Sequence, residues 1–116
     1  MQYLLMLYLQ EDAWPAMPES EKQYWMGAYR AYTEALTEAG VLRGSNRLQP
    51  SQGSVRVKVQ DGKSQVLDGP YADSKEQLGG YYLIEVADQD AALAWAARCP
   101  AASHGIVELR SVWPTA

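Results

Sequence analysis

The densest set of groups that could do chemistry lies in one run, residues 68–82, with the sequence DGPYADSKEQLGGYY. Its first residue, Asp68, could act as a general acid or base, or its carboxylate could instead stabilise the turn that Gly69 and Pro70 make. Lys75 and Glu76 could line a site or form an exposed charged pair. The candidate ligand contacts in this run and in nearby strands are Gly69, Pro70, Tyr71, Lys75, Glu76, Tyr81, Glu85 and Arg110.

His104 is the only histidine, and it falls in a predicted loop, residues 101–105, just before the last strand. An imidazole titrates near neutral pH, so His104 could shuttle a proton, with Asp68 as the second acid–base candidate. The alternative is an ordinary histidine on a surface loop. Cys99 is the only cysteine, and its place at the end of a predicted helix favours a small buried residue over a catalytic thiol.

Metal and phosphate chemistry are not expected. One histidine and one cysteine far apart in the chain cannot hold a metal ion, so no metal site is predicted. The pair Gly79-Gly80 leads into a strand rather than from a strand into a helix, so it is not a phosphate-binding loop. The sequence therefore predicts no cofactor.

Length and charge narrow the class of protein. The chain has 116 residues, which suits a single domain spanning residues 1–116, and its net charge is −4. An acidic surface argues against binding nucleic acid or an anionic membrane, because phosphate contacts need clustered Lys and Arg. The apolar N-terminal segment is shorter than the roughly 18–20 residues of a membrane span and has no signal-peptide features. With one cysteine no internal disulfide can form, which favours a cytoplasmic location.

Hydrophobic periodicity indicates the elements that must position these residues. Strands are predicted at residues 2–9, 54–60, 64–68, 81–87 and 106–112, a strand or extended segment at 41–48, and helices at 19–39 and, capped by Asp88, at 89–98. The turn signal Asp61-Gly62 predicts a hairpin, which we expect to form a sheet edge. Asp73 or Ser74 would cap a short helical turn at residues 75–78, and residues 11–18 would form a loop.

The first helix carries an aromatic stripe. Trp25, Tyr29, Tyr32 and Leu36 recur at helical spacing. Such a stripe could form a ligand pocket, but the spacing favours packing into the core.

The two central strands, residues 2–9 and 81–87, are apolar on both faces. The predicted fold is α+β: a ferredoxin-like split βαβ plan with an inserted β-hairpin, and an antiparallel sheet with helices on one face. The second face then needs cover, and we predict a homodimer packed sheet against sheet. Glu85, Glu108 and Arg110 would form ion pairs or line a pocket between subunits, and the sequence leaves open which face carries them.

The run from Asp68 to Val86 resembles the YCII-related proteins, in particular their DGPF branch, with Tyr71 at the place of the motif's Phe. The resemblance extends to the N-terminal YLLM strand, the EAGVL helix end, the VRVK hairpin strand, the ALAWAARCP helix and the final GIVELRSV strand. It implies the dimeric α/β-barrel superfamily. Some wider relatives carry a His-Asp pair proposed to be catalytic, and this chain departs from that pattern because its only histidine is His104.

Three functional hypotheses follow. The first is a homodimer with a small-molecule binding or catalytic cleft at the subunit interface; whether it is an enzyme stays open. The second is a regulatory or protein-interaction module acting with an extracytoplasmic-function sigma factor, which the resemblance implies because DGPF proteins are often found beside such factors. The third is a structural dimer without a ligand.

Overall fold

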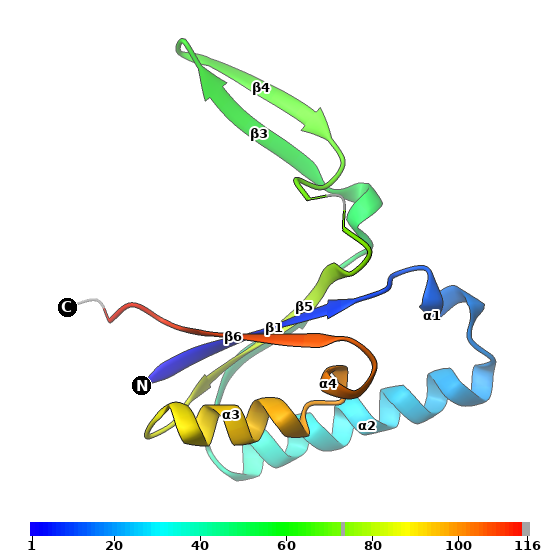
Figure 1. Ribbon diagram of the computed structural model, residues 1–116, viewed down its shortest axis with the longest axis vertical. Coiled ribbons are helices and arrows are strands. Elements are labelled where there is room, and N and C mark those ends of the chain that lie inside the picture. Colours follow the sequence, from blue (N-terminus) through cyan, green and yellow to red (C-terminus); the bar gives the residue numbers. More distant parts are fainter. Residues whose placement is uncertain (73, 115–116) are drawn as a thin grey trace.

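The computed structural model describes residues 1–72 and 74–114. Eleven elements follow one another along the described chain (Figure 1): β1 (Gln2–Leu9), α1 (Ala13–Ala16), α2 (Glu19–Glu38), β2 (Leu42–Arg47), η1 (Ser51–Gly53), β3 (Val55–Gln60), β4 (Lys63–Asp68), β5 (Gln77–Glu85), α3 (Gln89–Arg98), α4 (Ala101–His104) and β6 (Ile106–Ser111).

The main sheet has the strand order β2-β5-β1-β6, and its strand pairs are antiparallel. Leu5 of β1 lies between Tyr82 of β5 and Leu109 of β6. Helix α2 connects β1 to β2 and helix α3 leads from β5 toward β6, so each helix crosses over the same face of the sheet (Figure 1). This arrangement is the ferredoxin-like α+β plan, and it confirms the predicted fold class.

The core lies between this face and the two helices. Leu5, Ile84 and Leu36 are fully buried there, as alternation along the strands and the helical stripe require. Two buried tyrosines also fix the helices in place: the Tyr32 hydroxyl donates to the Trp95 carbonyl at 2.7 Å, and the Tyr82 hydroxyl lies 2.9 Å from Thr33 Oγ1. The polar ends of these rings are therefore satisfied inside an otherwise apolar layer.

The predicted helix ends are confirmed. The Asp88 carboxylate accepts a hydrogen bond from the Ala91 amide at 2.9 Å and so caps α3. Helix α2 ends before Gly40, whose φ of +73° is the left-handed conformation that terminates helices.

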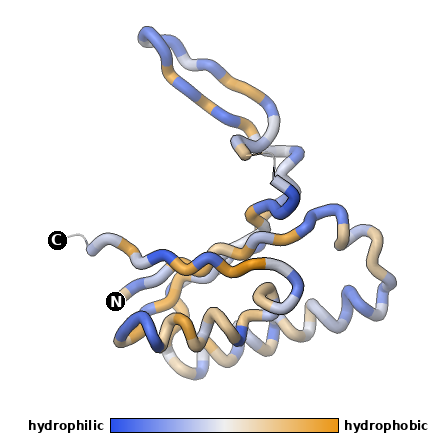
Figure 2. Tube along the Cα trace, viewed as in Figure 1, coloured by the Kyte–Doolittle hydropathy of each residue, from blue (hydrophilic) through white to orange (hydrophobic). Residues whose placement is uncertain are grey.

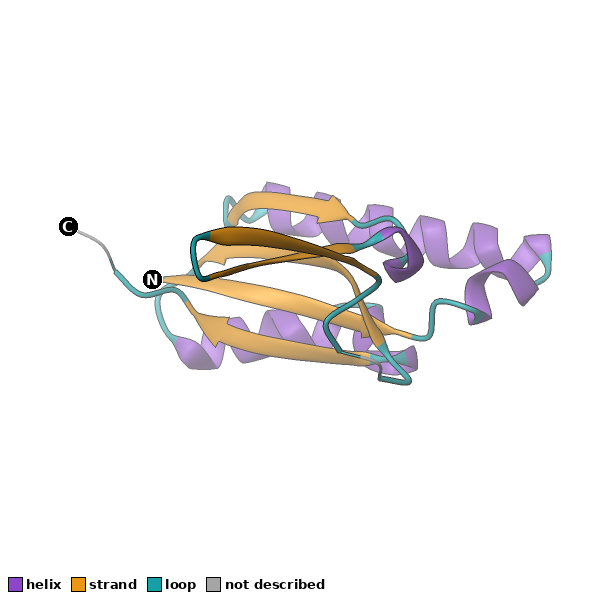
Figure 3. Ribbon diagram, turned by 90° about the horizontal axis from the view of Figure 1, so that it is seen from above, coloured by secondary structure: helices purple, strands orange, loops and turns teal. Residues whose placement is uncertain are grey.

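The hairpin β3–β4 forms a separate two-stranded sheet. Asp61 and Gly62 have φ values of 52° and 76°, as a tight hairpin turn requires. Figures 1 and 3 show that the hairpin projects from the main sheet on the side opposite the helices. The prediction that it forms an edge of the sheet is wrong, because β3 and β4 pair only with each other. Figure 2 shows hydrophobic and hydrophilic positions alternating along this hairpin.

Three local predictions are also wrong. Residues 75–78 do not form a helical turn, because β5 begins at Gln77 and continues through Gly79 and Gly80. Pairing of Gln77 and Leu78 with the end of β1 gives their backbone groups partners in a continuous ladder, which an isolated helical turn could not. Residues 101–104 form the short helix α4 rather than a loop, and the predicted loop at 11–18 contains α1. The proposed cap Asp73 lies outside the described residues.

The face opposite the helices carries the charged residues whose orientation the sequence left open. Strand pairing places Glu85, Glu108 and Arg110 on it, around the half-buried Met6 and Leu83. Glu85 forms an ion pair with Arg43 at 3.4 Å, and the Tyr8 hydroxyl donates to Glu108 at 3.3 Å.

Within the described chain, no helix combines the length and apolar character needed to cross a membrane.

Candidate functional site

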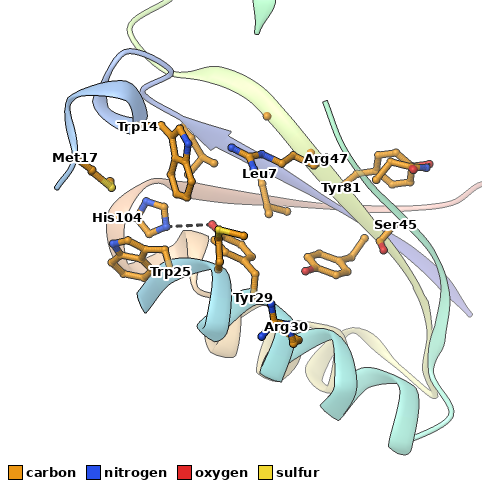
Figure 4. Close-up of a pocket in the computed structure, with 16 residues that line it drawn as sticks. Leu7, Trp14, Met17, Trp25, Tyr29, Arg30, Ser45, Arg47, Tyr81 and His104 are labelled. Atoms are coloured by element: carbon orange, nitrogen blue, oxygen red, sulfur yellow. Dashed lines mark hydrogen bonds between the residues drawn. The ribbon is translucent and has the colours of Figure 1, made fainter. Parts of the chain in front are cut away.

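A cavity of about 460 Å³ lies between the helix-covered face of the sheet and the N-terminal half of α2 (Figure 4). The lengths of the two helices explain its position. Helix α2 has 20 residues and α3 has 10, so α2 spans about 30 Å and α3 only about 15 Å. The end of the sheet that α3 does not reach is enclosed by α1, α4 and the first turns of α2. The lining residues include Leu7, Trp14, Met17, Trp25, Tyr29, Arg30, Ser45, Arg47, Gly80, Tyr81 and His104.

The walls of the cavity are mainly aromatic. Trp14 comes from α1, while Trp25 and Tyr29 lie one turn apart on α2. The His104 ring packs against Trp25 with a centroid distance of 4.2 Å and meets Tyr29 edge to face. A cavity with such walls and a few polar groups has the character of a small-molecule site.

His104 and Tyr29 form the polar centre of the cavity. The Tyr29 hydroxyl lies 3.1 Å from His104 Nε2 (Figure 4). Burial raises the pKa of Tyr29 well above its ordinary value of 10.0, and desolvation lowers the pKa of His104 below 6.5. At neutral pH the pair is therefore a protonated phenol beside a neutral imidazole, which can accept or relay a proton.

Two arginines supply the positive charge of the cavity. The Arg47 guanidinium lies 4.8 Å from the centre of the Trp14 ring, within cation–π distance. Its charge also reaches Tyr29, where it opposes the effect of burial by lowering that residue's pKa. Arg30 lines the cavity from α2, and the described lining residues include no aspartate or glutamate.

Two glycines set the local geometry of the site. Gly80 lies in β5 opposite Leu7 and Arg47, and a Cβ there would come within 2.9 Å of the Asn46 carbonyl oxygen. Gly105 connects α4 to β6, and a Cβ there would overlap the Tyr8 carbonyl oxygen. Glycine at these positions lets β2 approach β5 and lets α4 hold His104 against the end of β1.

The structure distributes the predicted site residues over several places. His104 and Tyr81 line the cavity. Pro70, Tyr71 and Glu76 line a second, more open hollow of about 730 Å³ at the base of the hairpin.

Asp68 and Gly69 lie where the hairpin ends. Asp68 is exposed and lines neither hollow, and its backbone carbonyl accepts a hydrogen bond from Arg56 at 3.2 Å. Gly69 has a φ of +94°, and its amide donates to the Ser54 carbonyl at 2.7 Å, closing the base of the hairpin. This segment therefore has a structural role in the turn. The acid–base role of Asp68 stays a prediction.

The remaining candidates lie elsewhere. Lys75 is exposed and lines neither hollow, while Glu85 and Arg110 lie on the sheet face opposite the cavity. An interface cleft therefore also stays a prediction, since the cavity described here is built by one chain on the helix side of the sheet.

Sequence reasoning missed Trp14, Arg30 and Arg47 as lining residues. No local motif marks them, because they come from three elements, α1, α2 and β2, that meet only in the folded chain. The aromatic stripe of the first predicted helix was a signal for two further lining residues. Its members Tyr32 and Leu36 are buried in the core, whereas Trp25 and Tyr29 line the cavity.

Cys99 is a buried residue, as predicted. Only 2% of it is exposed, and burial raises the pKa of its thiol to about 11. Its thiol is therefore protonated at neutral pH and a poor nucleophile. Residues 1–72 and 74–114 contain no cluster of metal-binding side chains.

Fold and cavity together define a ferredoxin-like α+β protein with an aromatic-walled site under one end of its sheet. The chain belongs to the YCII-related domain family, whose match covers residues 1–116. It is also similar to an uncharacterized protein of Rhizobium meliloti (strain 1021), with 35% identity over 96 residues, covering 83% of this chain and 77% of that protein. Membership of the DGPF branch stays a prediction from the Asp68–Tyr71 motif.

Proposed function

We propose that this protein binds a small organic molecule in the cavity between α2 and the sheet and that it works as a homodimer. The aromatic cavity of about 460 Å³ with the His104–Tyr29 pair at its centre carries the proposal. Its volume falls in the ~300–1,000 Å³ range of ligand sites, and its mostly apolar lining with few polar groups is typical of them.

If the protein is an enzyme, the pair suits it to proton transfer. The Tyr29 hydroxyl occupies His104 Nε2, so Nδ1 is the ring atom left to meet a ligand. In the tautomer with the ring proton on Nε2, that N–H donates to the Tyr29 oxygen and the free lone pair of Nδ1 can take a proton from the ligand. The tyrosine oxygen then stabilises the imidazolium by accepting from Nε2. His104 is then the general acid–base, and Tyr29 orients its ring.

The binding proposal can be tested by thermal unfolding across a panel of neutral, anionic and cationic metabolites. A ligand at a hundred times its Kd adds about 2.7 kcal/mol of stability. The melting shift should disappear in Trp25→Leu, which removes a cavity wall. It should persist in Trp113→Leu, which alters a tryptophan that is 87% exposed. A panel that gives no shift at all would contradict the proposal.

The homodimer is supported by apolar surface on the side opposite the cavity. Leu4, Met6 and Leu83 lie in the middle of the uncovered sheet face. The helices cover one face of the sheet, and the described chain supplies no layer over the other (Figure 1). An apolar sheet face is normally buried against a second layer. A second copy packed sheet to sheet would provide it.

The hairpin supports the same arrangement. Val57, Val59 and Val66 are 66%, 64% and 63% exposed, and an isolated two-stranded hairpin is only marginally stable in water. The radius of gyration is 16.3 Å, against about 13 Å for a compact chain of this length, because the hairpin projects.

The hairpin carries three basic and two acidic residues in a chain of net charge −4, so it complements the acidic remainder of a second copy.

A second candidate function is a regulatory module acting with an extracytoplasmic-function sigma factor, and the exposed hairpin is the observation that favours it. A hairpin with free valines could serve a different protein instead of a second copy. Hydrogen exchange on the purified protein distinguishes the two. Amides of β3 and β4 that are protected at high protein concentration indicate the homodimer, and unprotected amides leave this surface available to another protein.

A further inference from the structure

The charged side chains that line the cavity are positive, whereas the chain as a whole carries a net negative charge. The net charge is −4, yet the ionisable groups that line the cavity include two arginines and one histidine, with no aspartate or glutamate among the described lining residues. A concentration of cations in an acidic protein marks a site for a negatively charged ligand.

We propose that the cavity takes an aromatic monocarboxylate, whose carboxylate is held by Arg47 and whose ring lies between Trp14, Trp25 and Tyr29. This inference rests on the proposed small-molecule function and adds the chemical class of the ligand. It also assigns Arg47 as the residue that selects for charge.

The position of Arg47 suits it to this task. It is the last residue of β2 and pairs with Gly80 of β5, whose own partner on β1 is Leu7, so its side chain lies on the helix-covered face with the cavity. Figure 4 shows Arg47 lying over the sheet near Leu7 and Trp14. The one ion pair of the described residues joins Arg43 to Glu85, so Arg47 has no carboxylate partner among them. A guanidinium held on a tryptophan face keeps donors for a bidentate carboxylate.

The acidic residues Glu11, Glu19 and Glu21 near this end of the molecule do not line the cavity. Both carboxylate oxygens of Glu11 are taken by Ser51, at 2.7 Å from its amide and 2.6 Å from its hydroxyl. Glu19 and Glu21 lie in the first turn of α2, where they are exposed and do not line the cavity.

The cavity walls favour a ligand with a flat apolar ring system and a single charged group. Trp14, Trp25 and Tyr29 offer ring faces, and Met17 and Met26 offer adaptable thioether contacts. A polyphosphate would need many donors at once, whereas these walls are mostly carbon. His104 provides one further polar group in the lining of the cavity.

The proposal can be tested by calorimetric titration with three compounds of the same shape: naphthoate, the neutral naphthamide and the cationic naphthylmethylammonium. Naphthoate should bind about tenfold or more tightly than naphthamide, since a charge-assisted pair is worth at least that factor. Arg47→Gln should abolish this preference. Arg98→Gln is the matched control, because Arg98 stacks on Trp95 at 4.3 Å in the same way and does not line the cavity.

The outcomes separate this inference from the proposed function. Equal binding of naphthoate and naphthamide would overturn the anion preference while the cavity remains a small-molecule site. A preference that survives in Arg47→Gln, or that is lost in Arg98→Gln, would also overturn the role of Arg47. If the naphthyl compounds do not bind and the metabolite panel also gives no melting shift, the proposed function itself fails.

Discussion

His104 is the only histidine, so its ring titration can be followed by NMR without ambiguity. Desolvation lowers its pKa, and we expect a midpoint below the ordinary value of 6.5. Between the two values the folded protein binds fewer protons than the unfolded chain. The residue's contribution to stability is therefore present above about pH 6.5 and is lost as the pH falls through the folded-state pKa. A midpoint at or above the ordinary value would contradict the desolvated site.

At the residue scale, the type of a residue was a good guide to the chemistry it could do. The sequence was a poor guide to which of these residues lie together in the cavity. His104 was identified from its type alone, and it does line the cavity. Arg47 could not be identified, because its partner Trp14 is more than thirty positions earlier and the two meet only across the assembled sheet. Periodicity also cannot separate Tyr32 in the core from Tyr29 in a cavity wall, since both lie on the same stripe of α2.

At the element scale, long periodic segments were predictable and short ones were not. A continuous apolar run predicted β1, helical spacing predicted α2 and α3, and alternation predicted β6, because many residues in each favour the same state. The turn predicted at residues 75–78 failed because pairing with Tyr8 and Leu9 of β1 draws Gln77 and Leu78 into β5. That pairing depends on residues distant in the chain, so local preference is a poor guide there.

The junction between α4 and β6 gives an element-scale prediction. We expect Gly105→Ala to destabilise the protein by about 1–3 kcal/mol, because the new methyl group would overlap the Tyr8 carbonyl oxygen and the Leu9 side chain. Gly53→Ala is the control, since the space around that glycine is open, and its effect should stay within about 0.5 kcal/mol. Urea denaturation measures both. Equal stability of the two variants would show that the junction is not tightly packed.

At the scale of the whole molecule, the two sides of the sheet differ in what covers them. The helix side holds the core and, where α3 ends early, the cavity. The other side has an apolar centre with charged residues around it, and the hairpin projects beside it (Figure 3). If that side is covered by a second copy, assembly leaves each cavity intact in its own subunit. Binding and dimerisation can then be disturbed independently.

The last prediction uses this independence. Leu83→Glu places a charge in the middle of the uncovered face and should convert the dimer to a monomer in sedimentation equilibrium at micromolar concentration, because burying a carboxylate between two sheet faces with apolar centres is costly. Leu93→Glu makes the same exchange on α3, where the leucine is already 48% exposed, and should leave the dimer intact. Circular dichroism confirms that both variants are folded. A wild-type protein that sediments as a monomer, or a Leu83→Glu variant that remains dimeric, would rule out assembly through this face, and the apolar hairpin would then need another partner.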